Sequence, residues 1–311
     1  MKTKIKNIIF EYSRNSRITT KELGKIIGTS QQSSSYLLKS LKKKKFIIGN
    51  TTIVDSVKLG YINVIVGFNF LNPNVKKDIL DELLEISEII SIEEGKEGTD
   101  LLVEYATKNL SAFNKIHSDI IYKFFTKLKA KFVFPIIVSH EYHRNYLSKK
   151  FNNLDIILSG DRLLRELSKK EYSVLIELIK NPDKKLIDMA ESLKTHVKSI
   201  VRIKKDLERK YIIKGYSTIL DHNKLGINRQ IIFLKFSSEG IRELDKFTAY
   251  AKNNKNILKF IKIIGEYQAA IYVEYIKDIE VINDIRSNFQ IDNYFTMKSE
   301  KIHKKNYLPL E

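Results

Sequence analysis

The chain of 311 residues contains no cysteine. This absence excludes structural disulfides, zinc sites built on thiolates, and cysteine nucleophiles. Proline and glycine are also scarce, with four and twelve residues, and 43% of the chain is apolar, which is typical of a soluble globular protein. No apolar stretch is long enough to cross a bilayer, and the apolar run near the start, three residues long, is too short for a signal peptide. We therefore expect a cytoplasmic protein with no membrane partner.

Acidic residues are in the minority. The 37 acidic side chains are outnumbered by 55 basic ones, which gives a formal net charge of +18. An excess of this size attracts polyanions, and nucleic acid is the most common polyanion of the cytoplasm. A lysine-rich surface that is merely solvated has the same composition, so the charge alone leaves both interpretations open.

An internal repeat organises the chain. Residues 41–60 and 207–226, aligned at a constant offset of 166 positions, are identical at ten of their twenty positions. Such a repeat indicates that one structural unit occurs twice, with about 150 residues available to each copy. The identical pairs are Leu41/Leu207, Lys44/Lys210, Ile47/Ile213, Gly49/Gly215, Thr52/Thr218, Ile53/Ile219, Asp55/Asp221, Lys58/Lys224, Leu59/Leu225 and Gly60/Gly226.

Each repeated segment has the pattern of a helix end, a short strand, a turn and a second strand. Gly215 in the second copy, like Gly49 in the first, lies at the predicted turn, where a tight connection requires a positive φ. Isoleucines on either side supply β-branched strand residues. A helix that runs into a small hairpin is the last third of a winged helix-turn-helix.

Three helices are predicted before the first hairpin. Thr19 and Glu22 have the spacing of a capping box for the second helix, and Ser30 is a candidate N-cap for the third. Tyr36 and the leucines that follow it are predicted to form the apolar face of the third helix. Its opposite face and the basic wing are expected to contact DNA, and the alternative is a trihelical fold used only for protein contacts. The predicted DNA contacts are Ser30, Gln31, Gln32, Ser33, Ser34, Lys39, Lys42, Lys43, Lys44 and Lys45.

The second unit follows the same plan with one change. Lys194 stands where the first unit has Gly28, which makes the turn before the third helix less typical and the second unit the weaker candidate for DNA binding. Thr195 or His196 is the predicted cap of that helix. The predicted DNA contacts here are Thr195, His196, Lys198, Ser199, Arg202, Lys205, Arg209 and Lys210.

Beyond each hairpin the sequence predicts the order β-α-β-β-α-β, the ferredoxin-like split βαβ unit. The fold class is therefore α+β, with two tandem units that each contain a winged helix-turn-helix and a ferredoxin-like domain. Because each sheet has an exposed face to bury, we expect the two ferredoxin-like domains to pair within the chain, and dimerisation of whole chains stays open. The predicted domains are residues 1–60 (winged helix-turn-helix), 61–147 (ferredoxin-like), 148–166 (linker), 167–226 (winged helix-turn-helix) and 227–311 (ferredoxin-like).

The segment from Ile213 to Asp221, followed by Lys224-Leu225-Gly226, resembles the Lrp/AsnC (feast/famine) family of transcription regulators. It is most similar to archaeal members in which the unit is duplicated within one chain. The family joins a winged helix-turn-helix to a ferredoxin-like regulatory (RAM) domain, and the resemblance covers essentially the whole chain. It implies sequence-specific binding of double-stranded DNA, association through the RAM sheets, and often control by a small molecule such as an amino acid.

The same resemblance suggests where an effector would bind. In the family, a glycine followed three residues later by aspartate lies near the effector, in the turn between the second and third RAM strands. The second unit has glutamine in the place of that aspartate, and a neutral amide cannot pair with an ammonium group as a carboxylate does. The alternative is that the glycines simply close a tight hairpin. The candidate residues are Gly95, Gly98, Asp100, Gly265, Tyr267 and Gln268.

An enzyme is the first competing interpretation, because siroheme decarboxylases resemble paired Lrp/AsnC units. They depend on histidine- and arginine-bearing segments that we do not find in this sequence. The six histidines are scattered, and the close pair His140 and His143 would face opposite sides of a strand, which is poor geometry for a metal site. We therefore expect no catalytic activity, no metal and no cofactor.

An architectural protein that binds DNA with little sequence specificity is the second competing interpretation. Basic segments that contact only phosphates would be sufficient for such a role. Glutamine and arginine side chains on the third helices can recognise bases, whereas lysines mostly position the protein on the backbone. Because the two units differ in sequence, a regulator of this kind could favour two unlike half-sites.

Overall fold

The computed structural model describes residues 3–310. Met1, Lys2 and Glu311, which the predicted domain bounds include, lie outside this range. No helix within it is both long enough and apolar enough to cross a membrane.

Each unit begins with three helices, as the sequence predicts. Thr19 and Ser168 form capping boxes with Glu22 and Glu171, and Ser30 accepts the Ser33 N–H, so the expected helix starts are confirmed. The offset of 166 residues holds for the bounds of α1/α6 and α3/α8. The helices are α1 (Thr3–Arg14), α2 (Thr20–Ile27), α3 (Gln31–Lys43), α6 (Lys169–Lys180), α7 (Leu186–Ser192) and α8 (Val197–Arg209).

The turn between the second and third helices is the same in both units. Gly28 adopts φ +69°, and Lys194, at the equivalent position, adopts φ +47°. Lys194 therefore takes the left-handed conformation that favours glycine, and the second turn keeps its geometry although the glycine is missing. The less typical sequence does not make the second unit structurally different at this point.

Replacing Lys194 by glycine is expected to raise the free energy of unfolding by about 0.5–1 kcal/mol. Glycine removes the cost of the left-handed conformation, and its greater freedom in the unfolded chain offsets part of that gain. Urea denaturation followed by circular dichroism measures the change. The matched control is Gly28→Lys at the equivalent position, which should lower stability by a similar amount; a destabilised Lys194→Gly variant would contradict the argument.

The prediction of a wing hairpin within each unit is wrong. Each unit contributes one strand, β1 (Ile47–Val54) or β7 (Ile213–Leu220), and these two strands pair with each other antiparallel. Thr51 lies opposite Ser217, its own equivalent in the repeat, so the ribbon has a local two-fold axis of the kind found at a symmetric dimer interface. Lys44 and Lys45 lie at the end of α3 and in the turn after it, and not on a wing.

The equivalent glycines Gly49 and Gly215 lie within the strands of the ribbon and not in a turn. Neither has a positive φ. Gly49 lies opposite Ile219 and Gly215 opposite Ile53, and a Cβ at each glycine would be 3.7 and 3.8 Å from the Cδ1 atom of the facing isoleucine. The glycines therefore leave space for the isoleucine side chains across the ribbon.

The predicted order β-α-β-β-α-β is confirmed in both units. The first contains β2 (Ile62–Phe70), α4 (Lys76–Glu85), β3 (Ile89–Glu97), β4 (Leu101–Thr107), α5 (Leu110–Lys123) and β5 (Leu128–Glu141). The second contains β8 (Asn228–Phe236), α10 (Leu244–Asn253), β9 (Ile257–Ile263), β10 (Ala269–Tyr275), α11 (Val281–Asn288) and β11 (Ile291–Lys305).

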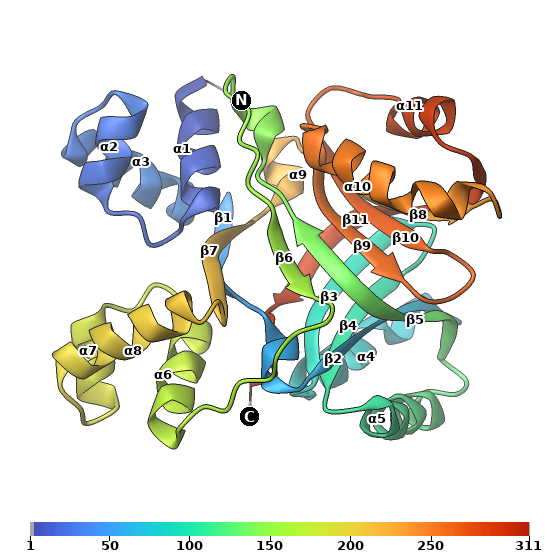
Figure 1. Ribbon diagram of the computed structural model, residues 1–311, viewed down its shortest axis with the longest axis horizontal. Helices are drawn as coiled ribbons and strands as arrows, with labels where there is room; N and C mark the ends of the chain where they lie inside the picture. Colours follow the sequence, from blue (N-terminus) through green and yellow to red (C-terminus); the bar gives the residue numbers. More distant parts are fainter. Residues whose placement is uncertain (1–2, 311) are drawn as a thin grey trace.

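The two sheets join into one closed barrel. The strand orders are β5-β2-β4-β3 and β11-β8-β10-β9, and the pairs β3–β11 and β5–β9 connect them edge to edge. Side chains of both units fill the space between the sheets, including Phe233 stacked on Phe295 with ring centroids 4.4 Å apart. The expected pairing of the two ferredoxin-like domains within one chain is thus present. Both trihelical units lie on the same side of the barrel, next to the β1–β7 ribbon (Figure 1).

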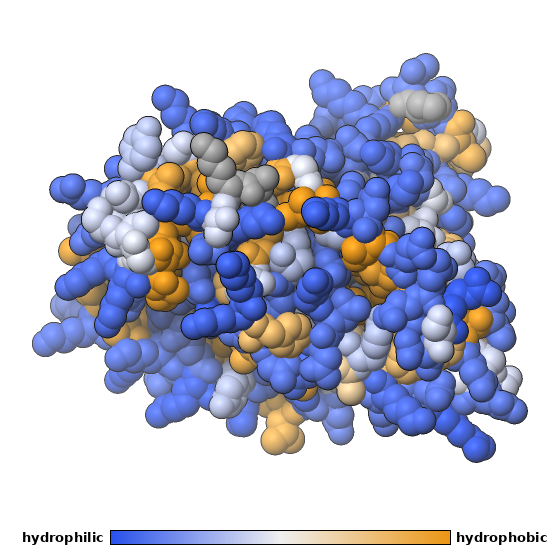
Figure 2. All heavy atoms as spheres, turned by 90° about the horizontal axis from the view of Figure 1, so that it is seen from above, coloured by the Kyte–Doolittle hydropathy of each residue, from blue (hydrophilic) through white to orange (hydrophobic). Residues whose placement is uncertain are grey.

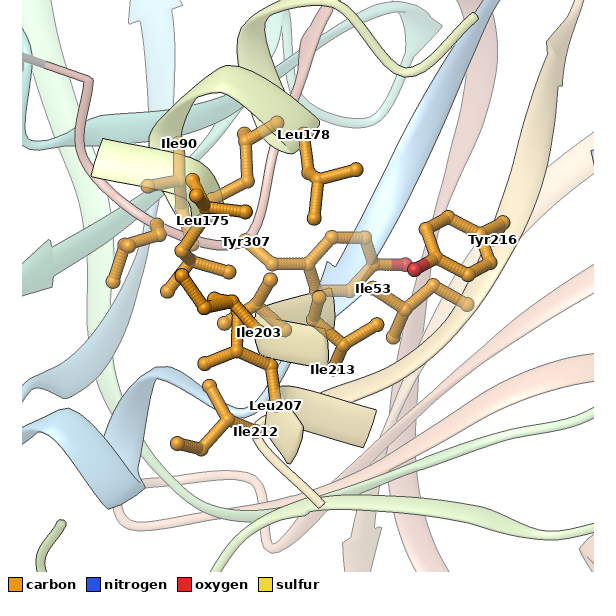
Figure 3. Close-up of a cluster of buried hydrophobic side chains, with 14 of the residues drawn as sticks. Ile53, Ile90, Leu175, Leu178, Ile203, Leu207, Ile212, Ile213, Tyr216 and Tyr307 are labelled. Atoms are coloured by element: carbon orange, nitrogen blue, oxygen red, sulfur yellow. The ribbon is translucent and has the colours of Figure 1, made fainter. Parts of the chain in front are cut away.

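The segment predicted as a linker, residues 148–166, is part of the fold. It contains β6 (Ile156–Ser159), which pairs with Val138–Glu141 of β5. Leu158 is buried in the core of the second trihelical unit. That core also takes Ile53 of β1, Ile90 of β3 and Tyr307 from the end of the chain, which pack among the side chains of α6 and α8 (Figure 3). The two units therefore share cores and are not two independent domains.

Candidate nucleic-acid interface

The third helices of the two units present matching exposed stripes. On α3, Gln32, Tyr36, Lys39 and Lys43 are exposed at spacings of four, three and four residues, which places them on one face of the helix. At the offset of 166 residues, α8 presents four exposed basic residues on the equivalent face. They are Lys198, Arg202, Lys205 and Arg209.

Tyr36 is an exposed residue of the α3 stripe that sequence reasoning missed. Its side chain is 73% exposed, although the sequence pattern predicts it on the apolar face. The buried face of α3 instead begins at Ser34 and continues to Leu41. Tyr36 lies with Thr20, Gln31, Gln32, Ser35 and Lys39 around a shallow hollow of about 510 Å³. The sequence did not show which face of α3 is turned towards the protein, and a shift of one residue rotates that face by about 100°.

Ser34 is not available to DNA, which corrects that prediction. Its side chain is fully buried, and its Oγ forms a hydrogen bond of 2.8 Å with the Thr29 hydroxyl. A Cβ at Gly24 would lie 3.1 Å from this Oγ and 2.8 Å from the Thr29 carbonyl oxygen. The Ser34 side chain is therefore part of the close contact between α2 and α3.

Lys42 holds the two trihelical units together. Its Nζ donates to Asp183 Oδ2 at 2.7 Å and lies 5.4 Å from the centre of the Tyr12 ring. Burial alone would lower the pKa of Lys42, but the Asp183 carboxylate outweighs it and the pKa is raised. At the position equivalent to Asp183, Arg17 donates to the Pro182 and Lys184 carbonyl oxygens at 2.6 and 3.0 Å. The predicted phosphate contact of Lys42 is therefore replaced by an intramolecular one.

Two further predicted phosphate contacts are engaged in ion pairs. Lys210 donates to Glu171 Oε1 at 2.8 Å, and this bond, together with hydrogen bonds from Ser168, lowers the pKa of Glu171 to about 2. Arg209 forms an ion pair with Asp206 at 2.9 Å but stays 79% exposed, so it keeps its place in the stripe. The remaining predicted residues Lys39, Lys43, Lys44, Lys45, Lys198, Arg202 and Lys205 are exposed, as are Ser30, Gln31, Gln32, Ser33 and His196, while Thr195 and Ser199 are half-buried.

Comparisons with known proteins bear on this arrangement. No protein-family model matches the chain. Over 83 residues the chain is 35% identical to an uncharacterized HTH-type transcriptional regulator of Pyrococcus horikoshii, covering 27% of this chain and 56% of that one. Over 131 residues it is 29% identical to another such regulator from Pyrococcus furiosus, covering 42% of this chain and 77% of that one. The chain thus spans about half the length of the first of these relatives.

A solved structure matches the whole length. The siroheme decarboxylase NirDL superposes with a TM-score of 0.59 over 99% of this chain and 94% of that one, at 12% sequence identity. At this identity the likeness concerns the fold. The chain consists of two halves that each contain three helices and a β-α-β-β-α-β unit. Their sequence similarity to HTH-type regulators covers part of the chain only.

The candidate effector residues make structural contacts within each half of the chain. Asp100 Oδ2 accepts the Phe70 N–H at 2.8 Å, and Gln268 Oε1 accepts the Phe236 N–H at 3.0 Å. Asp100 therefore occupies the position in the first half that Gln268 occupies in the second. Each side chain connects the start of one strand to the end of the neighbouring strand by a hydrogen bond. These contacts favour the hairpin interpretation over an effector pocket.

The glycines of these turns are required by close packing. Gly98 has φ +90°, and a Cβ there would lie 2.1 Å from the Thr296 carbonyl oxygen. A Cβ at Gly265 would lie 2.4 Å from the Phe134 ring, and one at Gly95 would lie 2.1 Å from the Thr99 carbonyl oxygen. Tyr267 packs edge-on against Phe134 and helps to close the barrel interior.

Two histidines that are far apart in sequence meet at one cavity. His222 and His303 both line an open groove of about 720 Å³ between the two halves of the chain. His222 Nε2 bonds to Glu274 Oε1 at 2.8 Å, and His303 Nε2 bonds to Glu94 Oε2 at 2.7 Å. Among residues 3–310 no group of three or more potential ligands is arranged to hold a metal ion.

A buried charge network joins the halves, and no pattern in the chain pointed to it. Glu274 is fully buried and accepts hydrogen bonds from Arg144 Nε, Tyr146 Oη, His222 Nε2 and Arg229 Nη1 at 2.8–3.0 Å. Arg229 also binds Glu93 with two hydrogen bonds, of 2.6 and 3.0 Å. The network includes residues of both halves, so it fixes their relative position.

Proposed function

We propose that this chain is a transcription regulator of the Lrp/AsnC type that binds double-stranded DNA through α3 and α8. The observation that carries the proposal is the pair of matching exposed stripes, one on each third helix, on trihelical units that lie on the same side of the barrel (Figure 1). A helix of this kind enters the major groove and contacts base edges there. The face of the molecule seen in Figure 2 is mainly hydrophilic.

The two stripes differ in chemistry, and we propose that α3 and α8 have different roles in DNA binding. Gln31, Gln32 and Tyr36 on α3 offer amide and hydroxyl groups that hydrogen-bond to bases, as glutamine does with adenine. At the positions equivalent to Gln32 and Tyr36, α8 carries Lys198, which mainly attracts phosphates, and Arg202, which attracts phosphates and can also bind the edge of a guanine. We therefore expect one well-defined half-site under α3 and a weaker sequence preference under α8.

Selection of bound sequences from random duplex DNA at near-physiological salt tests the proposal. Recovery of one strong half-site with a weaker one about one helical turn away is the expected result. Binding without any recurring motif would replace the regulator by an architectural DNA-binding protein. If no duplex were bound, the proposed function would be wrong.

Alanine at Gln31 and Gln32 together is expected to reduce discrimination between the selected site and a mismatched one by roughly 30-fold or more. Each bidentate contact to a base contributes about 1–3 kcal/mol of discrimination, whereas binding to non-specific DNA depends on the phosphates and should hardly change. Competition titration with the two duplexes measures this. The matched control is Lys198→Ala, at the position equivalent to Gln32, which should weaken binding to both duplexes alike. If the glutamine variant discriminated as well as the parent protein does, Gln31 and Gln32 would not be part of the DNA-binding site.

A catalytic alternative comes from the full-length likeness to NirDL, a siroheme decarboxylase whose structure was also determined with an iron-uroporphyrin III analogue. His222 and His303 share one cavity here, but each ring uses Nε2 to bind a buried glutamate. Absorbance titration with iron uroporphyrin III is therefore expected to show no ligation. A spectral shift that disappears in His303→Ala would favour the catalytic alternative.

A further inference from the structure

The two halves differ at one strand edge. Within residues 3–310, the end of β5 has a strand on both of its edges, whereas the equivalent end of β11 has a strand on one edge only. Residues Val138–Glu141 of β5 pair with β9 on one edge and with β6 on the other. The equivalent part of β11 pairs with β3, while β8 follows β11 only as far as Lys298. Among residues 3–310, therefore, no strand covers the other edge of β11 from residue 299 to 305.

The covered edge shows how a strand binds at such a place. The Ser159 N–H donates to Asp55 Oδ1 at 3.0 Å and Arg162 Nε donates to Asp55 Oδ2 at 3.3 Å, so β6 and the residues after it bury the Asp55 side chain completely. The Cδ1 atom of Ile156 would lie 3.9 Å from a Cβ at Gly215, so this isoleucine packs over the glycine of β7. Backbone pairing, one polar anchor and one apolar contact hold the strand.

Next to the uncovered edge of β11, the equivalent polar and apolar groups are partly exposed. Asp221, the repeat equivalent of Asp55, has a side chain that is 26% exposed and lines the groove of about 720 Å³. Ile48 is 44% exposed beside Gly49, the equivalent of Gly215. The Glu300 carbonyl oxygen faces the groove, where it accepts a hydrogen bond of 2.9 Å from Asn223, and an added strand would replace this bond. The groove thus has the polar, apolar and backbone groups that the covered edge uses.

The charge of the groove indicates what would bind. Lys224 is paired with Asp221, and Glu94 is paired with both Lys76 and His303. Lys45 and Lys301 also line the groove, and Glu300 adds a third carboxylate there. Four lysines and three carboxylates leave the groove with a net charge of +1, counting histidine as neutral. A carboxylate of an incoming strand would neutralise this charge. Lysines along a strand edge also oppose its pairing with a second copy of the chain.

We propose that the free edge of β11 and the groove beside it bind an extended acidic segment of another protein, with apolar residues at alternate positions, as an added strand. Main-chain hydrogen bonds supply affinity in this mode of recognition, and pockets for alternate side chains supply specificity. The proposal is independent of DNA binding, because the groove residues other than Lys45 lie outside the DNA contacts.

The test uses a peptide of residues 152–161, the segment that contains β6, as the probe. It is acidic at Asp155 and Asp161, and within the chain it fits the equivalent edge. The chain has no cysteine, so Ile48→Cys places a single thiol in the groove, and Lys214→Cys places one at the equivalent covered position. A peptide with cysteine in place of Ile157 is then mixed with each full-length variant under mild oxidation, and the disulfide-linked product is quantified.

The expected result is at least tenfold more product with Ile48→Cys than with Lys214→Cys, together with slower hydrogen exchange in residues 299–305. A peptide with proline at the position of Leu158 should lose both effects, because proline cannot donate to the ladder. Equal products from the two variants, or unchanged exchange in residues 299–305, would overturn the proposal. A concentration-dependent dimer of the protein that Ile48→Asp abolishes would assign the edge to a second copy and overturn it as well.

Discussion

Replacing Lys198, Arg202, Lys205 and Arg209 by alanine together is expected to lower the affinity for every duplex DNA by about 1,000-fold at 0.15 M salt. Each side chain that neutralises a phosphate releases a counterion and contributes about 0.9 to the slope of log affinity against log salt concentration. The loss of four contacts should therefore make that slope shallower by about 3 to 4 units. Titrations of labelled duplex at several salt concentrations measure both quantities.

A matched control separates local contacts from net charge. Lys115, Lys127, Lys129 and Lys246 are exposed on the barrel, away from α3 and α8, and replacing them by alanine removes the same total charge. This control should change the affinity much less and leave the slope nearly unaltered. If both variants lost affinity equally, the basic stripe of α8 would not be a contact surface, and non-local attraction by the charge of +18 would account for binding.

Replacing Glu274 by alanine is expected to lower the free energy of unfolding by about 3–5 kcal/mol. The substitution removes the carboxylate that Arg144 and Arg229 share. Arg144 then loses its partner Glu274 while Arg229 keeps Glu93, and breaking such a largely buried pair has a cost of about this size. Urea denaturation followed by circular dichroism measures it. Glu82→Ala, which breaks the exposed ion pair of Glu82 with Lys123, is the control and should cost less than about 1 kcal/mol. A loss of that small size for Glu274→Ala would show that the network does not hold the two halves together.

The same network gives stability a dependence on pH. Burial alone would raise the pKa of Glu274, but Arg144, His222 and Arg229 outweigh it and hold the pKa well below its ordinary value of 4.5. A carboxylate with a depressed pKa contributes stability that is present above its unfolded pKa and is lost as the pH falls through its folded pKa. Stability should therefore decrease on acidification below about pH 4.5, and Glu274→Gln should flatten this decrease.

Local sequence signals located the elements of this protein well. The capping boxes at Thr19 and Ser168 and the offset of 166 residues place the helices in both units. Alternation between strand and helix periods predicted the β-α-β-β-α-β order correctly. These signals act within a few residues along the chain, because caps and helical faces are formed by neighbours three or four positions apart.

The exposed faces were predicted less well. A run of four lysines from Lys42 to Lys45 gives no indication that Lys42 alone faces Asp183, which lies in the other unit. Ser34 and Tyr36 exchange their expected roles because the face that α3 buries depends on how closely α2 approaches it at Gly24. The assignment of Gly49 and Gly215 to turns failed because a strand that precedes a glycine can pair either with the next segment or with a distant one.

The sequence by itself determined that one α+β unit occurs twice, which segments are helices and strands, and that third helices with polar and basic faces are present. Only the tertiary structure decided which strands pair, which lysines are exposed and which polar groups are buried. The pairing of β1 with β7, the closing of the barrel by β3–β11 and β5–β9, and the addition of β6 all join residues far apart in the chain. Such contacts depend on the complementarity of two surfaces in space, and no periodicity within one segment encodes the surface that it will meet.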